Sequence, residues 1–359
     1  MGSLTLTGAN TFTGDIHIQS GTLSVQSDQN LGNGSSVQLE GGTLEITQSF
    51  STGRTIHATA VSNLRIVGNN TVFTTTGTLS GNSITKQGTG TWTISADNPA
   101  YTGAIMVRFG SFVNNKDLSS TSVTVFGGGT LGGTGHIGSI VNKGRVSPGN
   151  SIGTLHIVGD YTQASIGELF IEINAKSGNS DLLEVTGNVN LDGLLTIKPN
   201  NGNYFAEGDT YTIITSNGIS GIQGTFSSLH VLNQRNLRFD VLYHPNDVQI
   251  TLLSNALFLG MDVSEYNPRH VQDYLNTIAY YQNGQVIPSE QELLSIIESM
   301  STDSVILSEQ LDQMHPAPFG AFALFNRVFQ QRHFNNIAPS KQADRINRAN
   351  MLTLHISFS

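Results

Sequence analysis

The sequence contains no cysteine and few charged residues. Without cysteine the chain cannot form disulfides, thiolate metal sites or cysteine nucleophiles. Aspartate, glutamate, lysine and arginine make up 12% of its 359 residues, roughly half of the usual share. The formal net charge is −9 and the lysines and arginines do not cluster. This distribution argues against a surface that binds nucleic acid or an anionic membrane.

Long apolar segments are also missing. No run approaches the ~20 residues that a transmembrane helix needs. The first residues, MGSLTL, have neither the basic nor the apolar region of a secretory signal peptide, so we expect no signal peptide in this chain. The length is sufficient for a sizeable core, and a solenoid accommodates such a length as one body.

Glycine, in contrast, is abundant, with 39 residues. Between the glycines of residues 127–173 the apolar residues keep a two-residue spacing, as in Leu169, Ile171 and Ile173. That spacing is typical of strands, not of helices. Because glycine allows sharp turns and each short strand can bury only one face, such strands need neighbours stacked on them.

A tripeptide of glycine, serine or threonine, and a large apolar residue recurs through the first half of the chain. The successive glycines are 19, 21, 48, 20, 19 and 24 residues apart, and we interpret 48 as two turns of 24. A repeat of about 20 residues predicts one turn of a parallel β-helix. We expect the large residue, Trp92 included, to point inward in each turn, with only Gly77-Thr78-Leu79 out of register. The tripeptides in register begin at Gly2, Gly21, Gly42, Gly90, Gly110, Gly129 and Gly153.

Two longer patterns indicate a duplication and a β-hairpin. Residues 4–25 can be aligned with residues 92–115 at an offset of 89, which indicates a duplication. Near residue 250, the alternating segments LRFDVLY and DVQITLL flank a short polar turn and predict a β-hairpin. A hairpin-rich end can cover the exposed edge of a solenoid.

The pattern of an aromatic residue, Thr-Gly, a strand and Gly-Thr-Leu resembles the passenger-associated repeats of bacterial autotransporters, the proteins of type V secretion. The pair PGNSIGTL (148–155) and DLLEVTG (181–187) is similar to their junction or autochaperone region. The resemblance covers most of residues 1–254. It implies an all-β fold: a right-handed, single-stranded parallel β-helix with a hairpin-rich C-terminal cap, followed by a short α-helical linker.

On this basis we expect four segments. Residues 1–122 form β-helix turns, 123–254 the passenger C-terminal or autochaperone cap, 255–335 an α-helical linker, and 336–359 a truncated tail. The linker sequence EQLDQMHPAPFGAF is similar to that of chlamydia-like relatives. In the family a translocator barrel follows, and too few residues remain here to close one.

The resemblance implies a structural, non-enzymatic and adhesin-like role: a stalk and folding nucleus that displays upstream sequence at the outer membrane or cell surface, or is secreted. Its expected partners are the translocator barrel, normally in cis, and a host-surface or glycan ligand, with no nucleic acid. The residues leave one alternative open, a β-helical protein that binds or cleaves polysaccharide. That alternative requires a groove with clustered acids and aromatics on one sheet face.

Several motifs suggest chemistry without the context that it needs. Ser151 lies in a G-x-S-x-G match over residues 149–153, but a strand rather than a helix is expected after it. Residues 133–138 match G-x-G-x-x-G, again with no helix following. The histidines are dispersed, and turn hydrogen bonds explain Asp160 and Asp181 without a metal. We therefore predict no catalytic, cofactor-binding or metal-binding residue and expect no cofactor.

Overall fold

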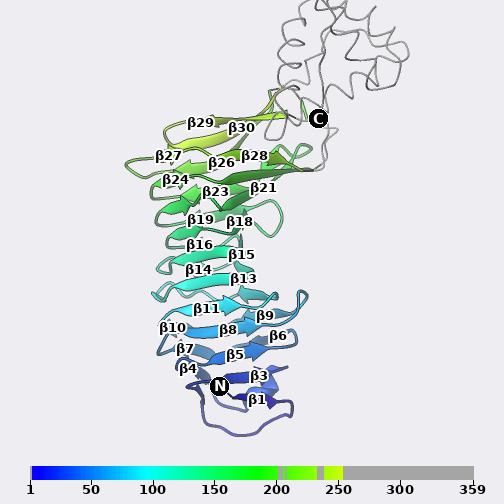
Figure 1. The fold of residues 1–359 in the computed structure, drawn as a ribbon, viewed down its shortest axis with the longest axis vertical. Coiled ribbons are helices and arrows are strands. Elements are labelled where there is room, and N and C mark those ends of the chain that lie inside the picture. Colours follow the sequence, from blue (N-terminus) through cyan, green and yellow to red (C-terminus); the bar gives the residue numbers. More distant parts are fainter. Residues whose placement is uncertain (1, 201–204, 207, 233–237, 254–359) are drawn as a thin grey trace, which may run out of the picture. The chain divides into compact units, whose positions relative to one another are not determined.

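The computed structural model describes residues 2–200, 205–206, 208–232 and 238–253. Contacts divide the chain into two compact units. The first, Met1–Asn233 with Asp240–Thr251, is a parallel β-helix whose successive coils stack on one another (Figure 1). Of the second, Gln234–Phe239 with Leu252–Ser359, only short pieces fall among the described residues. Among the described residues, no helix has the length and apolar character needed to cross a membrane.

Each coil contributes strands to ladders of mostly parallel strands. The first ladder lies in a 19-stranded sheet. It consists of β1 (Ser3–Leu6), β3 (Thr22–Val25), β5 (Thr43–Ile46), β8 (Ser62–Ile66), β11 (Ile84–Gln87), the start of β13 (Ile105–Asn114), the start of β15 (Val123–Gly133), β17 (Ile140–Asn142), β20 (Tyr161–Gln163), β24 (Val189–Leu191) and β27 (Ile222–Gly224).

The second ladder belongs to the same sheet because β13 and β15 run through both. It consists of β6 (Phe50–Thr52), β9 (Val72–Thr75), β12 (Thr91–Ile94), the ends of β13 and β15, β18 (Arg145–Pro148), β21 (Glu168–Asn174), β25 (Leu194–Asn200) and β28 (Ser228–Val231). The register of the β13–β15 pair shifts between Val107 and Phe109. A β-bulge of this kind bends the two strands where the ladders meet.

The third ladder is divided into two sheets. One contains β2 (Ile16–Ile18), β4 (Ser36–Leu39), β7 (Thr55–Ala58) and β10 (Leu79–Gly81). The other contains β14 (Asp117–Leu118), β16 (His136–Ile137), β19 (Thr154–Ile157), β23 (Leu182–Val185), β26 (Thr210–Ser216), β30 (Asp247–Leu253) and β29 (Arg238–Tyr243). A short 3₁₀ helix, η1 (Asp28–Leu31), and the two-residue strand β22 (Asn179–Ser180) complete the elements.

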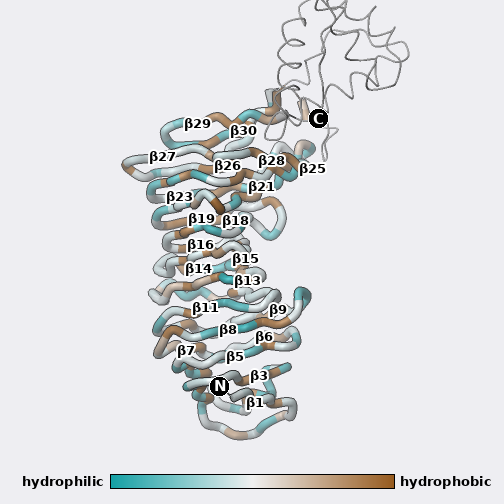
Figure 2. Tube along the Cα trace, in the orientation of Figure 1, coloured by the Kyte–Doolittle hydropathy of each residue, from teal (hydrophilic) through white to brown (hydrophobic). Residues whose placement is uncertain are grey.

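In-register apolar residues form columns inside the β-helix, and Figure 2 shows hydrophobic positions recurring along the coils. The second ladder aligns five large residues, and the rings of Phe50 and Phe73, like those of Trp92 and Phe112, have centroids 5.1 Å apart. Trp92 is fully buried, which confirms its predicted place in the core. This column consists of Phe50, Phe73, Trp92, Phe112 and Leu131.

The expected single register of the tripeptides is wrong. A single register would place Thr91 in the first ladder, two coils after Thr43. Thr85 holds that position instead. Thr91 lies in the second ladder and Thr154 in the third. Each coil turns several corners that tolerate glycine, so the tripeptide marks a corner but not always the same one. The first ladder holds Ser3, Thr22 and Thr43, and the second holds Thr91, Ser111 and Thr130.

The duplicated segments therefore occupy different ladders. Leu4 lies in the first ladder and Trp92, its counterpart in the alignment, in the second. Leu4 is 60% exposed, so the expectation that it points into the core is wrong. Within the described residues, β1 pairs only with β3, and no further coil covers it.

Polar side chains also enter the interior, and Lys86 is the largest of them. Its side chain lies on the inward side of β11 and is fully buried. The ammonium donates hydrogen bonds to the carbonyl oxygens of Gly88 (2.6 Å), Gly90 and Phe109 (2.7 Å). Lys86 thus joins the corner of its own coil to the next one. Burial lowers the pKa of Lys86 to about 8.

A second interior group forms around Asn142 and Gln163, which are buried one coil apart. The Asn142 amide donates to Gln163 Oε1 (3.2 Å) and to the Glu168 carbonyl (2.9 Å). The Gln163 amide donates to the carbonyls of Asp192 (2.8 Å) and Leu194 (3.0 Å). Because buried carbonyls need donors, these amides stabilise the corners of successive coils.

The last coils depart from the parallel pattern. β26 pairs with β30 in antiparallel fashion, and β29 is the next strand of that sheet. The His244 amide donates to the Asp247 carbonyl across the turn (2.9 Å), which confirms the predicted hairpin. The predicted helical linker over 255–335 and the tail over 336–359 lie outside the described residues.

Candidate functional site

The loop with the G-x-S-x-G match connects two strands, β18 and β19. Ser151 is exposed in this loop, and Gly149 before it has a positive φ of 84°. A nucleophile elbow requires a strand followed by a helix, so the local geometry differs from that of the motif. Within the part of the chain that the structure describes, the Ser151 hydroxyl forms no hydrogen bond to a histidine or a carboxylate.

Asp181 fastens this loop to the next coil. Its side chain is fully buried, with Oδ1 accepting the Gly153 amide (2.9 Å) and Oδ2 accepting the Glu172 amide (2.8 Å). The backbone repeats both connections, since the Asp181 amide donates to the Glu172 carbonyl (2.8 Å) and the Leu182 amide donates to the Gly153 carbonyl (3.0 Å). One carboxylate therefore joins PGNSIGTL, β21 and DLLEVTG.

The electrostatics of Asp181 follow from its burial. Desolvation raises the pKa of the carboxyl to about 7, while the hydrogen bonds from the Glu172 and Gly153 amides act in the opposite direction. The nearby Glu172 raises the pKa further and Lys198 lowers it. Lys198 itself pairs with Glu172 at 2.5 Å. Asp181 consequently changes its charge near neutral pH.

Asp160 has a comparable place at another corner. Its Oδ1 accepts the Asn188 amide (2.8 Å), and Asn188 Oδ1 accepts the Ser220 amide (2.9 Å). The Asp160 amide in turn donates to Ser139 Oγ (3.1 Å). Short polar side chains thus connect the corners of consecutive coils, and turn hydrogen bonds account for the positions of both aspartates.

The G-x-G-x-x-G match leads from β15 into another strand, β16, so it presents no helix N-terminus to a phosphate. Its glycines have a packing role. Gly133 has φ of 108°, and a Cβ at Gly135 would lie 2.5 Å from the Lys116 backbone nitrogen. Only glycine allows the coils to approach this closely.

Two of the histidines meet, although the sequence suggests that they are dispersed. His136 and His156 are register partners in the third ladder, and their rings stack with centroids 4.6 Å apart. His156 Nδ1 also lies 2.5 Å from Glu184 Oε2. Over the described ranges, no group of three or more histidine, aspartate or glutamate side chains is placed to hold a metal ion.

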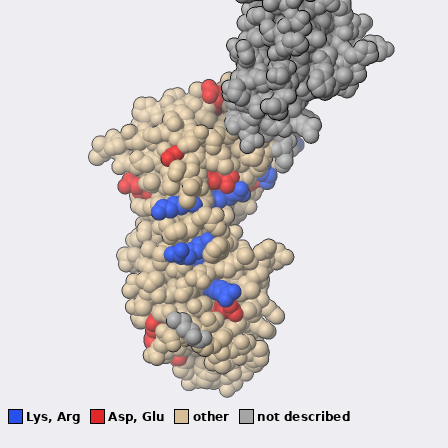
Figure 3. All heavy atoms as spheres, in the orientation of Figure 1, with Lys and Arg blue, Asp and Glu red and all other residues tan. Residues whose placement is uncertain are grey.

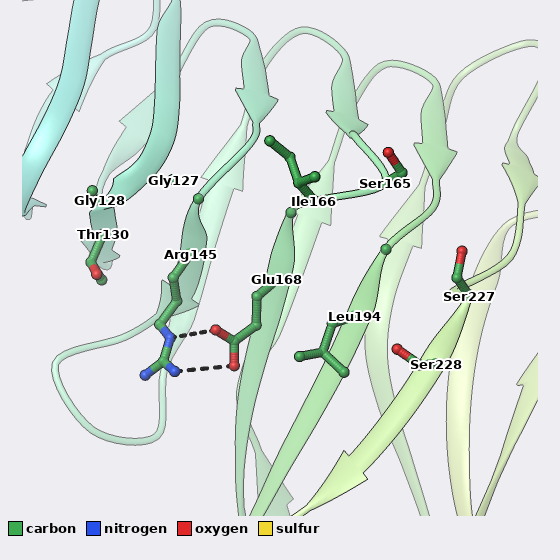
Figure 4. A pocket seen from close by; sticks show the side chains of 14 residues that line it. Gly127, Gly128, Thr130, Arg145, Ser165, Ile166, Glu168, Leu194, Ser227 and Ser228 are labelled. Carbon is green, nitrogen blue, oxygen red and sulfur yellow. Dashed lines mark hydrogen bonds and ion pairs between the residues drawn. The ribbon is translucent and has the colours of Figure 1, made fainter. Parts of the chain in front are cut away.

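A hollow of about 400 Å³ lies where the corners between the first and second ladders stack (Figure 4). We call it the glycine trough. Its floor has no side chains because a Cβ at Gly167 would lie 2.5 Å from the Asn142 carbonyl, and one at Gly144 or Gly193 would meet the preceding coil as closely. Gly193 also has a positive φ of 70°. The floor glycines are Gly129, Gly144, Gly167 and Gly193.

An ion pair lies across the glycine trough. The guanidinium of Arg145 contacts Glu168 in a bidentate arrangement, with Nε 2.8 Å from Oε2 and Nη2 3.1 Å from Oε1 (Figure 4). Arg145 Cζ also lies 4.7 Å from the centroid of the Phe170 ring. A paired and stacked arginine is held in one orientation, and the charges of the pair cancel.

The other lining side chains are apolar or carry hydroxyls. Ile166 is 72% exposed, and Leu194 of the next coil is the register partner of Glu168. Ser165, Ser227 and Ser228 line the hollow from neighbouring turns (Figure 4). On the face seen in Figure 3 most of the surface of the described residues is likewise neither acidic nor basic. The sequence does not predict the trough because the lining residues follow no fixed interval.

A family model and two known proteins match parts of this chain. The passenger-associated-transport-repeat family matches residues 1–25 and 84–113. These ranges overlap the two segments that the sequence aligns with each other, which supports the duplication. The first holds β1, β2 and β3, and the second holds β11, β12 and most of β13.

Similar proteins include an extracellular serine protease of Serratia marcescens, 30% identical over 155 residues, which are 40% of this chain and 14% of that protein. They also include an adhesin autotransporter, BmaC, of Brucella suis biovar 1 (strain 1330), 40% identical over 81 residues. That match covers 22% of this chain and 2% of the adhesin. The chain thus spans only a small part of the length of these relatives.

Proposed function

We propose that this chain, an autotransporter passenger region by its repeats and its relatives, acts as a structural stalk whose C-terminal part is the folding nucleus. In this proposal residues 123–254 form first and residues 1–122 stack on them. The observation that carries it is the Asp181 carboxylate, which joins three separate strands or loops of the C-terminal part.

The physical basis is the way solenoids gain stability. A single coil buries too little apolar surface to fold alone, so a nucleus needs contacts that hold several coils together. Asp181 and the antiparallel β26–β30 pair provide such contacts near the C-terminal end of the β-helix. The first coils contain mainly parallel ladders, which each new coil can extend.

The proposal also covers the location, the role and the partner of the passenger. Surface display or secretion, an adhesin-like role and a translocator barrel as the partner in cis are inferred from the autotransporter relatives. We assign the described residues a non-enzymatic role because the Ser151 loop lies between two strands. The protease activity is that of the relative from Serratia marcescens, and we do not propose it for the described residues.

The test is refolding of the full chain with Asp181→Asn. The asparagine side chain has an NH₂ donor where aspartate has an acceptor oxygen. This donor then faces a backbone N–H, which is also a donor. Trp92 reports the folding of the first half because it is the only tryptophan and is fully buried there. If Asp181 acts in the nucleus, D181N slows the refolding that Trp92 reports. The folding φ-value, the change in the activation free energy of folding divided by the change in stability, should be about 0.5 or more.

Asp15→Asn is the matched control, since Asp15 also accepts a backbone amide, from Ser36 (3.0 Å), but lies in residues 1–122. We expect D15N to accelerate unfolding and leave the refolding rate unchanged. A D181N variant that unfolds faster but refolds at the normal rate would refute a nucleus in the C-terminal part. Deletion of residues 123–254 should also leave the remaining coils sensitive to proteases.

A further inference from the structure

We propose that the glycine trough binds an uncharged oligosaccharide. This activity goes beyond the folding role and does not depend on it. The trough lies on the outside of the β-helix, and its volume of about 400 Å³ is within the range of ligand pockets. It crosses several coils, which are spaced by ~4.8 Å, so it fits an elongated ligand lying along the axis.

Charge argues for a neutral ligand. The charged side chains that line the trough are Arg145 and Glu168, and they neutralise each other through two contacts. An anion or a cation gains little there, because each charge of the pair is already compensated by the other. An uncharged ligand can use the outward edge of the pair for hydrogen bonds and leave it intact.

The backbone of the floor argues against a peptide strand. The amides of Glu168, Leu194 and Ser228 donate to the carbonyls of Gly144 (2.7 Å), Gly167 (2.9 Å) and Gly193 (3.2 Å). The floor therefore consists of backbone already paired between coils, whereas strand addition requires an unpaired edge. The ligand must instead be recognised by side chains and by the flat glycine surface.

The side chains match the two kinds of surface that a sugar ring presents. A pyranose has an apolar face of C–H groups and an edge of hydroxyls. Ile166, 72% exposed, and Leu194 offer apolar contact, and the Ser165 and Ser228 hydroxyls lie on the same hollow. An exposed isoleucine beside hydroxyls and a fixed arginine is a surface for such an amphipathic ligand.

The lining residues include no aromatic side chain and no cluster of acids, so the trough is not the groove expected for the polysaccharide alternative, and the same residues indicate binding of a short oligosaccharide without cleavage. Most glycoside hydrolases use two carboxylates that flank the scissile bond. Glu168 is the carboxylate among the lining side chains, and Arg145 occupies both of its oxygens. The trough thus has no second acid opposite Glu168 among its lining residues.

The experiment measures binding of oligosaccharides to the full chain by calorimetry. The probes are neutral hexamers of β-1,4-linked glucose, α-1,4-linked glucose and β-1,4-linked N-acetylglucosamine, with a heparin hexasaccharide as the anionic comparison. We expect at least one neutral hexamer to bind with Kd below ~1 mM and more tightly than heparin. Ile166→Ser should weaken that binding by about fivefold or more through loss of apolar contact.

The control is Ile219→Ser, which changes a fully exposed isoleucine outside the trough. It should leave binding unchanged. A second variant, Ser165→Trp, fills the trough from an exposed position and should abolish binding while circular dichroism remains that of the parent. The proposal is overturned if no neutral hexamer binds, if heparin binds more tightly, or if I166S and I219S behave alike.

Discussion

Replacing Lys86 by methionine tests how the interior of the β-helix is held together. Lys86 is fully buried, and its ammonium donates to three carbonyls at the junction of two coils. Methionine has a similar length, so it fills the space but leaves those carbonyls without the donor. Each buried group that loses its partner costs about 1–3 kcal/mol, and release of the buried charge offsets part of the sum. We expect K86M to lower the free energy of unfolding by about 3 kcal/mol at neutral pH.

The pH dependence provides a second readout. The pKa of Lys86 falls from 10.5 to about 8 on folding, so between these values the unfolded chain binds more protons than the native one. The free energy of unfolding of the parent therefore rises with pH through this window, relative to K86M, by about 2–3 kcal/mol in total. At pH 7 and below, Lys86 is mostly protonated in both states, so the difference levels off.

The assay is urea unfolding followed by Trp92 fluorescence at pH 7, 8, 9 and 10.5, with the slope of the transition compared between variants. Lys143→Met, at an exposed position, controls for the loss of a lysine charge. Two results would refute the reasoning: a K86M variant as stable as the parent at pH 7, or a parent-minus-variant difference that stays flat from pH 8 to 10.5.

Three further predictions use the same unfolding assay. Gly110→Ala should lower the free energy of unfolding more than Gly178→Ala does. Both glycines have φ near 70°, but a Cβ at Gly110 would lie 2.6 Å from Lys86 Nζ, whereas nothing lies within 4 Å of one at Gly178. Equal losses of stability would argue against the close contact at Gly110. Thr196→Val should stabilise the protein by about 1 kcal/mol because, among the described residues, the buried Thr196 hydroxyl has no hydrogen-bond partner; a loss would show that the hydroxyl is satisfied. Burial raises the Asp181 pKa from 3.8 to about 7, so the native state binds the extra proton between these values, and the parent should lose stability relative to D181N as pH rises from 4 to 7; a gain over that range would contradict the raised pKa.

Much of the fold could be predicted from local sequence. The two-residue spacing and the glycine corners predicted stacked strands, and Trp92 was placed in the core because large residues that follow a glycine corner tend to be inward. The hairpin of β29 and β30 was predicted from alternation around a polar turn. These features depend on neighbours in the sequence, which a single chain reveals directly.

What could not be predicted depends on stacking between coils of unequal length. Tyr161 pairs with Val189, and Val189 with Ile222, so the later coils are longer than the earlier ones. Without these pairings, the assignment of Thr91 to the second ladder and the alignment of Gly144 with Gly167 could not be foreseen. Alternation points Lys86 inward, but lysine is rarely buried, so its position was not anticipated.

The ladders determine how the β-helix responds to force. Among the described residues, the strand ladders join each coil to the coils directly before and after it, so the ladder hydrogen bonds lie along the axis and bear in series a pull applied to the two ends. Tension then peels one coil at a time, and a coil of ~20 residues releases ~70 Å of extended chain. A stalk built in this way yields in small steps and can recover each one by rewinding a single coil.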